Sequence, residues 1–174
     1  MMKHATGHRY LIALGSNRRH VRHGAPRDVL AKALRRLGRH DVKVEAVSRT
    51  ISSAPIGPSQ RRFANAVALV ETERAPDAML ALCKRIERKF GRRRGRRWGS
   101  RVIDLDIILW SGGIWTSQTP SLAIPHPGFR GRDFVLGPAA AIARDWRDPL
   151  TGLTIGQLHA RLRRPRPAMP PQAA

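Results

Sequence analysis

The sequence predicts an α+β domain with a ferredoxin-like βαββαβ core, to which a hairpin and carboxy-terminal helices are added. Short apolar runs with the two-residue period of strands alternate with two longer runs at helical spacing. The 174 residues have 41% hydrophobic content, which is enough for one buried core. We therefore expect a single domain over residues 1–164, built on one sheet with helices on one face, and a disordered tail at 165–174.

The first half of the chain predicts a strand, a helix and a second strand. Residues 10–14 form an apolar run that ends at Gly15-Ser16-Asn17, as is typical of a buried strand. Residues 26–37 place their apolar side chains on one helical face, and Gly38 marks the end of that helix. Residues 42–53 are rich in β-branched and small side chains and predict one long strand, followed by a Pro/Gly loop.

The second half predicts two further strands with a helix between them. Residues 63–70 alternate large and small side chains and predict the third strand, with Asn65 as its polar exception. Residues 76–90 predict a helix that ends before Gly91 and carries Cys83 in its apolar stripe. Residues 103–110 predict the fourth strand, which continues into a hairpin at 111–116. Beyond it we expect loop at 120–133, helices at 134–144 and 154–163, and a turn at 148–152.

Two acids interrupt the apolar fourth strand. Alternation sends Ile103, Leu105, Ile107 and Leu109 to one face and Asp104 and Asp106 to the other. Residues two apart on a strand are about 6.6 Å apart at Cα, so these carboxylates can share a hard cation such as Mg²⁺. The alternative is that both acids line a wet strand face. Because strands are depleted in Asp, we favour a functional site.

A basic segment precedes the two acids directly. Residues 92–101 contain six arginines and two glycines, and no acid lies between Arg88 and Val102. Such a segment is difficult to explain as a salt-bridged helix surface. Arginines beside a Mg²⁺ site are suited to binding phosphates, so the acids and this segment predict one phosphoryl-transfer site, in which the segment closes over the bound phosphates.

The net charge of +21 calls for a polyanionic partner, and nucleic acid, nucleotides and acidic membranes all qualify. The lone cysteine cannot form an internal disulfide, and the amino terminus lacks the apolar run of a signal peptide. No segment approaches 18 consecutive apolar residues. We therefore expect a cytoplasmic protein. His20 and His23 have a spacing that metal ligands use, but without a second cluster we expect a solvated loop there.

Several function classes lack their sequence signals. The third strand has none of the aromatic run of an RNA-recognition module, since Phe63 is its only aromatic residue. The P-loop motif, the protein-kinase signatures and the G-x-S-x-G element of hydrolases are also absent. A nucleotide must therefore be held in another way.

The stretch Arg97-Trp98-Gly99-Ser100-Arg101-x-x-Asp104-Leu105-Asp106-Ile107-Ile108 resembles the signature of the 6-hydroxymethyl-7,8-dihydropterin pyrophosphokinases. Enzymes of this family transfer the β,γ-diphosphate of ATP to a pterin alcohol in the folate pathway. Supporting pieces occur at residues 13–17, 55–58, 63–66, 91–94, 124–127 and 132–134, so the resemblance covers Tyr10 to Gly156.

The resemblance implies a role for each matching position. Two Mg²⁺ ions would bind Asp104 and Asp106, and Arg92 and Arg101 would act on the transferred group. ATP would contact Arg94, Arg97, Trp98, Ile107, His126 and Arg132. The pterin would lie between Phe63 and Phe134, with its polar edge on Asn65 and on the segment that holds Ser53, Pro55 and Ile56. The implied partners are ATP and the pterin alcohol, with no specific nucleic acid and no membrane, and the implied form is a monomer.

The sequence also departs from the family pattern. Ser100 stands where the family has Pro, Ser53-Ala54-Pro55 stands for Thr-Pro-Pro, and the basic segment is unusually rich in arginine. None of these changes removes a reacting group. The excess charge leaves a basic RNA-binding ferredoxin-like module as an alternative, and a paralogue that has lost activity is another.

Overall fold

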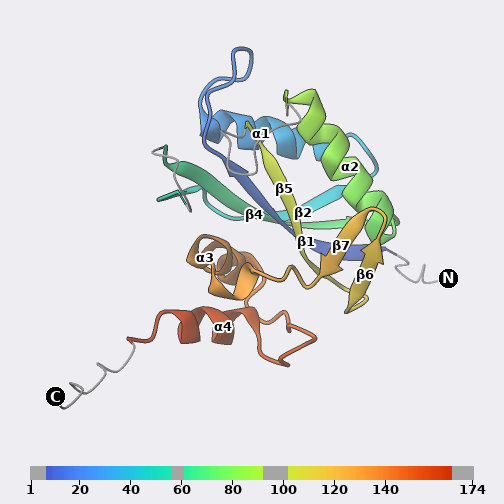
Figure 1. Ribbon diagram of the computed structural model, residues 1–174, viewed down its shortest axis with the longest axis vertical. Coiled ribbons are helices and arrows are strands. Elements are labelled where there is room, and N and C mark those ends of the chain that lie inside the picture. Colours follow the sequence, from blue (N-terminus) through green and yellow to red (C-terminus); the bar gives the residue numbers. More distant parts are fainter. Residues whose placement is uncertain (1–6, 56–60, 92–101, 166–174) are drawn as a thin grey trace.

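The computed structural model describes residues 7–55, 61–91 and 102–165 (Figure 1). Its elements follow in chain order: β1 (His8–Ser16), α1 (Pro26–Leu37), β2 (Lys43–Val47), β3 (Ile51–Ser53), β4 (Phe63–Thr72), α2 (Pro76–Lys89), β5 (Asp104–Trp110), β6 (Trp115–Gln118), β7 (Ser121–Ile124), the 3-10 turn η1 (Phe129–Gly131), α3 (Asp133–Ile142) and α4 (Ile155–Leu162).

The main sheet has the strand order β2-β4-β1-β5, with β3 also paired to β4, and all these pairs are antiparallel. This order confirms the ferredoxin-like core. The prediction of one long strand over 42–53 is wrong, because two strands share the edge of β4. The pairing register slips by one residue between Val44 and Ala46 and by one more between Val47 and Ile51. At the break, the Ser48 hydroxyl accepts a hydrogen bond from the Val67 backbone N–H at 2.9 Å.

Helices cover both faces of this sheet. α1 and α2 bury one face, where Tyr10, Ile12 and Leu14 of β1 belong to the larger core. α3 and α4 lie on the other face, where Leu11 of β1 and Val67 of β4 belong to a second core (Figure 1). The expectation of helices on one face is therefore wrong for the whole chain. A sheet with apolar side chains on both faces needs a cover on each.

The predicted hairpin at 111–116 is also wrong. β5 ends in a tight turn in which the Gly113 N–H donates to the Trp110 carbonyl at 3.0 Å. Trp110 and Gly113 form an isolated bridge there rather than a paired strand. β6 instead pairs forward with β7 in a separate two-stranded sheet, within a segment predicted partly as loop. The rings of Trp110 and Trp115 meet edge to face with their centroids 5.6 Å apart, so an aromatic contact holds this hairpin to the core.

β5 contains a bulge that the alternation pattern does not reveal. Leu109 pairs with Leu11, whereas Ile107 pairs with Ile12, so Ile108 is an extra residue. Ile107 consequently faces α1 and α2, but Leu109 joins Ile108 in the core beneath α3. The prediction that Leu109 shares the face of Ile107 is wrong, whereas the opposite placement of the two acids is confirmed.

The helix ends follow the sequence with one exception. Proline occupies the first turn of α1 and of α2, and Gly91 has a φ of +84° just beyond α2. Gly38 ends α1 with a right-handed φ of −62°, and the left-handed residue of that turn is Asp41. α4 begins with a capping box between Thr154 and Gln157.

Two smaller expectations concern single side chains. Cys83 is fully buried, as predicted, and burial raises the pKa of its thiol to about 12. His20 and His23 are half-buried rather than solvated, because their rings stack with centroids 4.4 Å apart and the His23 ring packs on Phe90.

Among the described residues, no helix combines the length and the apolar composition that crossing a membrane requires.

Gly112 is expected to tolerate no side chain. A Cβ there would lie 2.3 Å from the ring of Trp110, which is held between Trp115 and His8. Gly112→Ala should therefore lower the free energy of unfolding by about 1–3 kcal/mol through overpacking. The matched control is Gly131→Ala, whose added Cβ meets no atom within 4 Å. Thermal unfolding of both variants checks this, and equal midpoints would contradict it.

Candidate active site

The candidate site lies on the α3 side of the main sheet, where side chains of three adjacent strands form one row. Gly15 of β1 is the Cα partner of Asn65 on β4 and of Asp104 on β5. One step along, Ala13 is the partner of Val67 and of Asp106. The register thus aligns the polar residues that the sequence singled out, although 39 positions separate Asn65 from Asp104.

Gly15 keeps the centre of this row open. A Cβ at this position would lie 3.4 Å from Asn65 Oδ1 and 3.9 Å from Phe63 Cδ1. A larger side chain would fill the space between the β4 and β5 ends of the row. An added Cβ would meet both atoms at ordinary van der Waals distance, so glycine here leaves space in the row rather than relieving strain.

Asp104 and Asp106 are half-buried on the same face of β5. Their oxygens are the hard donors that Mg²⁺ prefers, and Mg²⁺ commonly takes few carboxylates and completes its shell with water and phosphate oxygens. Within the described residues, no group of three or more His, Cys, Asp or Glu side chains could hold a metal. A two-carboxylate donor set of this kind fits Mg²⁺ better than zinc, which favours closed sets of nitrogen and sulfur ligands.

His126 lies on the segment between β7 and α3, close enough to Asp106 and to Arg132 to feel the charge of each. The His126 N–H donates to the Ile108 carbonyl at 3.0 Å, which ties this segment to the bulge of β5. Burial lowers the pKa of His126, the Asp106 charge opposes this and the Arg132 charge adds to it. The net lowering leaves a neutral imidazole at pH 7, and its Nδ1 accepts a hydrogen bond from the Gly128 N–H at 3.1 Å.

The other end of the row holds the residues expected to bind the pterin. Asn65 is buried, and its Nδ2 donates to Ser53 Oγ at 2.8 Å, so β3 and β4 fix the orientation of the amide. Phe63 is half-buried beside Gly15. Phe134, at the start of α3, is half-buried against the second core, and Pro55 is half-buried at the edge of the described residues.

One residue that bears on the site was missed from the sequence. Glu87 of α2 is fully buried, and its Oε1 accepts the Leu105 backbone N–H at 2.9 Å. Lys84 Nζ lies 3.1 Å from the same oxygen. Leu105 stands between the two acids, so Glu87 ties their strand to α2. The sequence did contain a signal for Glu87, because an acid next to Ile86 falls within the apolar stripe of the predicted helix.

The structure does not bring every predicted residue together. The side chain of Ile107 is buried beneath α1 and α2, on the face opposite the acids, so only its backbone can border the site. The predicted roles of six further residues lie outside the described ranges: Ile56, Arg92, Arg94, Arg97, Trp98 and Arg101.

A family model described as 7,8-dihydro-6-hydroxymethylpterin-pyrophosphokinase matches residues 11–144. Curated proteins named 2-amino-4-hydroxy-6-hydroxymethyldihydropteridine pyrophosphokinase are similar over much of the chain. The Pseudomonas aeruginosa protein is 40% identical over 143 residues, which are 81% of this chain and 84% of that protein. The Haemophilus influenzae protein is 40% identical over 136 residues, 77% and 81% of the two chains. The match to the Synechocystis protein, also 40% identical, covers 67% of this chain and 59% of that one.

A solved structure supports the fold independently. A wild-type Plasmodium falciparum HPPK-DHPS chain superposes with a TM-score of 0.64 at 14% identity, over 89% of this chain and 41% of that one. At this identity the likeness concerns the fold alone.

Proposed function

Because this chain belongs to the 7,8-dihydro-6-hydroxymethylpterin-pyrophosphokinase family, we propose that it transfers diphosphate from ATP to 6-hydroxymethyl-7,8-dihydropterin in folate biosynthesis. The observation that carries the proposal is the row across the sheet, in which Asn65 at one end and Asp104 at the other flank the open position of Gly15. Such a row suits a reaction that joins a flat polar ring to a phosphate chain.

The β5 end of the row is assigned to ATP. Asp104 and Asp106 would hold two Mg²⁺ ions, which when bound neutralise phosphate charge during transfer. Because His126 Nδ1 accepts the Gly128 N–H, Nε2 of the neutral imidazole carries the proton and can donate one hydrogen bond to a phosphate oxygen, and Arg132 can pair with a phosphate. By matching position, we assign Arg92 and Arg101 to the transferred group, and Arg94, Arg97, Trp98 and the backbone of Ile107 to the nucleotide.

The β4 end is assigned to the pterin. Its ring would stack between Phe63 and Phe134, and Asn65 would hydrogen-bond its polar edge, with support from Ser53 and the segment from Pro55 to Ile56. We also propose that the protein works as a cytoplasmic monomer, since the only cysteine is buried and free.

The direct test incubates the purified protein with ATP, Mg²⁺ and the pterin alcohol. We expect AMP to be released in equal amounts with the pterin diphosphate, and only when both substrates and Mg²⁺ are present. AMP formed equally without pterin would contradict the assignment. So would the absence of AMP, which is the outcome expected of an inactive paralogue.

Asn65→Ala should weaken pterin binding while leaving ATP binding unchanged. Loss of the amide removes one or two hydrogen bonds to the ring, and each is worth about 0.5–1.5 kcal/mol, so we expect KM for the pterin to rise about tenfold. Ser52→Ala, an exposed change on the neighbouring strand, is the control and should alter neither KM. An equal rise of KM for ATP would assign Asn65 to general stability of the site.

A further inference from the structure

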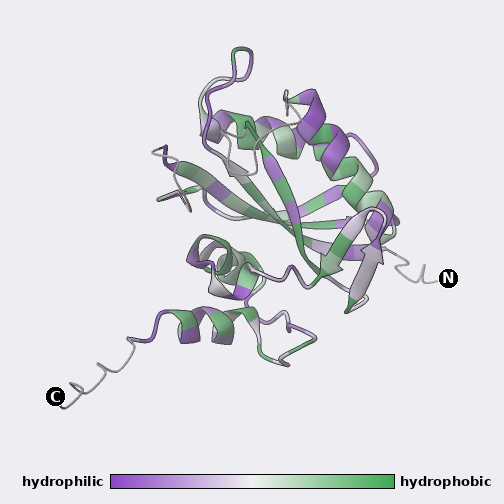
Figure 2. Cartoon of the chain, in the orientation of Figure 1, coloured by the Kyte–Doolittle hydropathy of each residue, from purple (hydrophilic) through white to green (hydrophobic). Residues whose placement is uncertain are grey.

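The outer surface of α1 and α2 is not used by the proposed reaction. These helices lie side by side over the sheet face opposite the two acids, and Figure 2 shows hydrophilic segments along both. Among the exposed basic side chains of the two helices and of the turn just beyond α1, we group six as the α1–α2 basic face: Lys32, Arg35, Arg39, Arg85, Arg88 and Lys89.

The charges of this face are not neutralised by neighbouring acids. In the ranges that the structure describes, no carboxylate lies within salt-bridge distance of any of the six side chains. Glu87, on the same helix as Arg88, turns inward and is buried. Two exposed acids, Asp28 of α1 and Asp41 just beyond it, border the face, so its six basic charges outnumber the neighbouring acids and favour an anionic partner.

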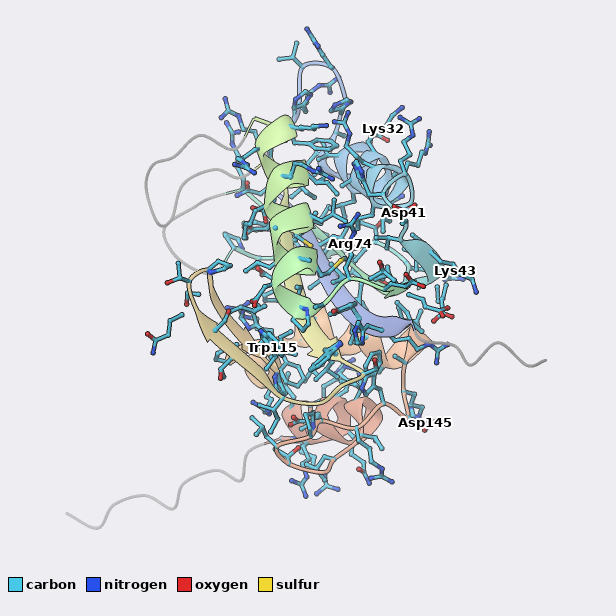
Figure 3. All side chains as sticks on the ribbon, turned by 90° about the vertical axis from the view of Figure 1, so that its right-hand side faces the viewer. Lys32, Asp41, Lys43, Arg74, Trp115 and Asp145 are labelled. Atoms are coloured by element: carbon cyan, nitrogen blue, oxygen red, sulfur yellow. The ribbon has the colours of Figure 1, made fainter. Side chains whose placement is uncertain are left out.

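Two basic side chains from the α2 side contact His40, just beyond α1: Arg85 of α2 and Arg74, two residues before that helix. Arg85 Nη2 lies 3.2 Å from His40 Nδ1, and Arg74 Nε and Nη2 each donate to the His40 carbonyl at 3.3 Å. In Figure 3, Lys32 and Arg74 lie on the side of α2 where α1 runs. Burial lowers the pKa of His40. Nearby positive charges lower it further, and these come from α1, from α2 and from the segment before α2: Arg85, Lys89, Arg74 and Arg36.

The composition of this face restricts the class of partner. The exposed large apolar side chains of the described residues all lie outside both helices: Val21, Val47, Ile51, Ile114, Leu150 and Leu162. Membrane-binding helices and protein interfaces use apolar anchors. Proteins that bind single strands use aromatic platforms, and the aromatic residue nearest the face, Phe90, is 2% exposed. The class of partner that fits this face is a polyanion held through its phosphates alone.

We propose that the α1–α2 basic face binds the phosphate backbone of a nucleic-acid duplex without reading its base sequence. The twelve-residue helix α1 is about 18 Å long. A duplex carries one negative charge per about 1.7 Å of its axis, so this length spans on the order of ten phosphates. Four of the six side chains in this face are arginines, and the arginine guanidinium pairs with phosphate through two parallel hydrogen bonds.

Fluorescence anisotropy with a labelled RNA duplex of 16 base pairs tests the proposal. The variant replaces four charges of the face: Lys32→Gln, Arg35→Gln, Arg85→Gln and Arg88→Gln. The matched control removes four exposed charges from the α3 and α4 side: Arg144→Gln, Arg161→Gln, Arg163→Gln and Arg164→Gln. At low salt the first variant should bind at least tenfold more weakly. Its slope of log K against log salt should be shallower by about 3–4, whereas the control should stay near wild type.

Further ligands separate the alternatives. A DNA duplex and RNA duplexes of unrelated sequence should bind as well as the first, whereas a single strand of equal length and anionic vesicles should bind more weakly. Equal losses of duplex affinity in both fourfold variants would show that binding depends only on net charge, and would overturn the proposal. Tighter binding to single strands or vesicles would overturn it as well.

Activity and a smaller variant act as controls for folding. Both fourfold variants should keep wild-type AMP release, because none of the substituted residues lies in the candidate active site. If a fourfold variant does not fold, the pair Lys32→Gln and Arg35→Gln takes its place, with an expected slope change of about 2. An unchanged slope in that pair would overturn the proposal.

Discussion

Asp106→Asn is expected to lower turnover by about a thousandfold or more, which corresponds to about 4 kcal/mol of lost transition-state stabilisation. The substitution keeps the shape of the side chain but removes one negative charge from a two-carboxylate site. Asp104→Asn should have an effect of the same order, since both acids lie on one face of β5. Steady-state AMP release at saturating ATP and pterin measures the effect.

The fold should survive these changes. Both acids are half-buried, and interactions of partly exposed carboxylates contribute little to stability, so replacing either should change the thermal midpoint little. Asp145→Asn, an exposed change on the loop after α3, is the control and should keep full activity. If both Asp104→Asn and Asp106→Asn kept wild-type turnover, the acids would be a solvated strand face rather than a site.

Asp148→Ala should be the most destabilising single change outside the cores. The carboxylate is fully buried and accepts two hydrogen bonds from Arg130, at 2.7 and 2.8 Å. It also accepts from the Thr151 hydroxyl at 2.7 Å. Removing it leaves the guanidinium without its partner, and breaking a buried pair in this way costs about 3–5 kcal/mol. Chemical denaturation of the variant against wild type gives the difference.

The same interaction predicts a dependence on pH. Burial opposes ionisation of Asp148, but the hydrogen bonds from Arg130, Thr151 and the Leu150 N–H outweigh it, so its pKa is lowered. A carboxyl with a lowered pKa stabilises the fold above the unfolded value of about 3.9, and this contribution is lost as pH falls through the folded value. The stability gap between wild type and Asp148→Ala should therefore be constant from pH 5 to 7 and shrink below about pH 4. A gap that grew with acid would contradict this account.

The sequence predicted the features that depend on local periodicity. Apolar runs, β-branched content and the two-residue period located the segments that form the core sheet, and the period placed Asp104 and Asp106 on the face away from Ile107. Features that depend on pairing between distant strands were not predictable in this way. The register slips beside β4 divided the strand predicted at 42–53, and the role of Gly15 became visible only once Asn65 and Asp104 lay on either side of it. Glu87 was missed for the same reason, because its partner is a backbone N–H 18 residues away.

The extra residue at Ile108 divides β5 into two halves of opposite phase. Trp110 and Leu109 fix the far half against Tyr10 and Leu11, so the orientation of the near half depends on how many residues lie between them. A deletion of one residue here would turn Asp104 and Asp106 inward, among the apolar side chains beneath α1 and α2, whereas most substitutions would not. The side of the sheet on which the two acids lie therefore depends on the number of residues in β5 more than on which apolar residue occupies position 108.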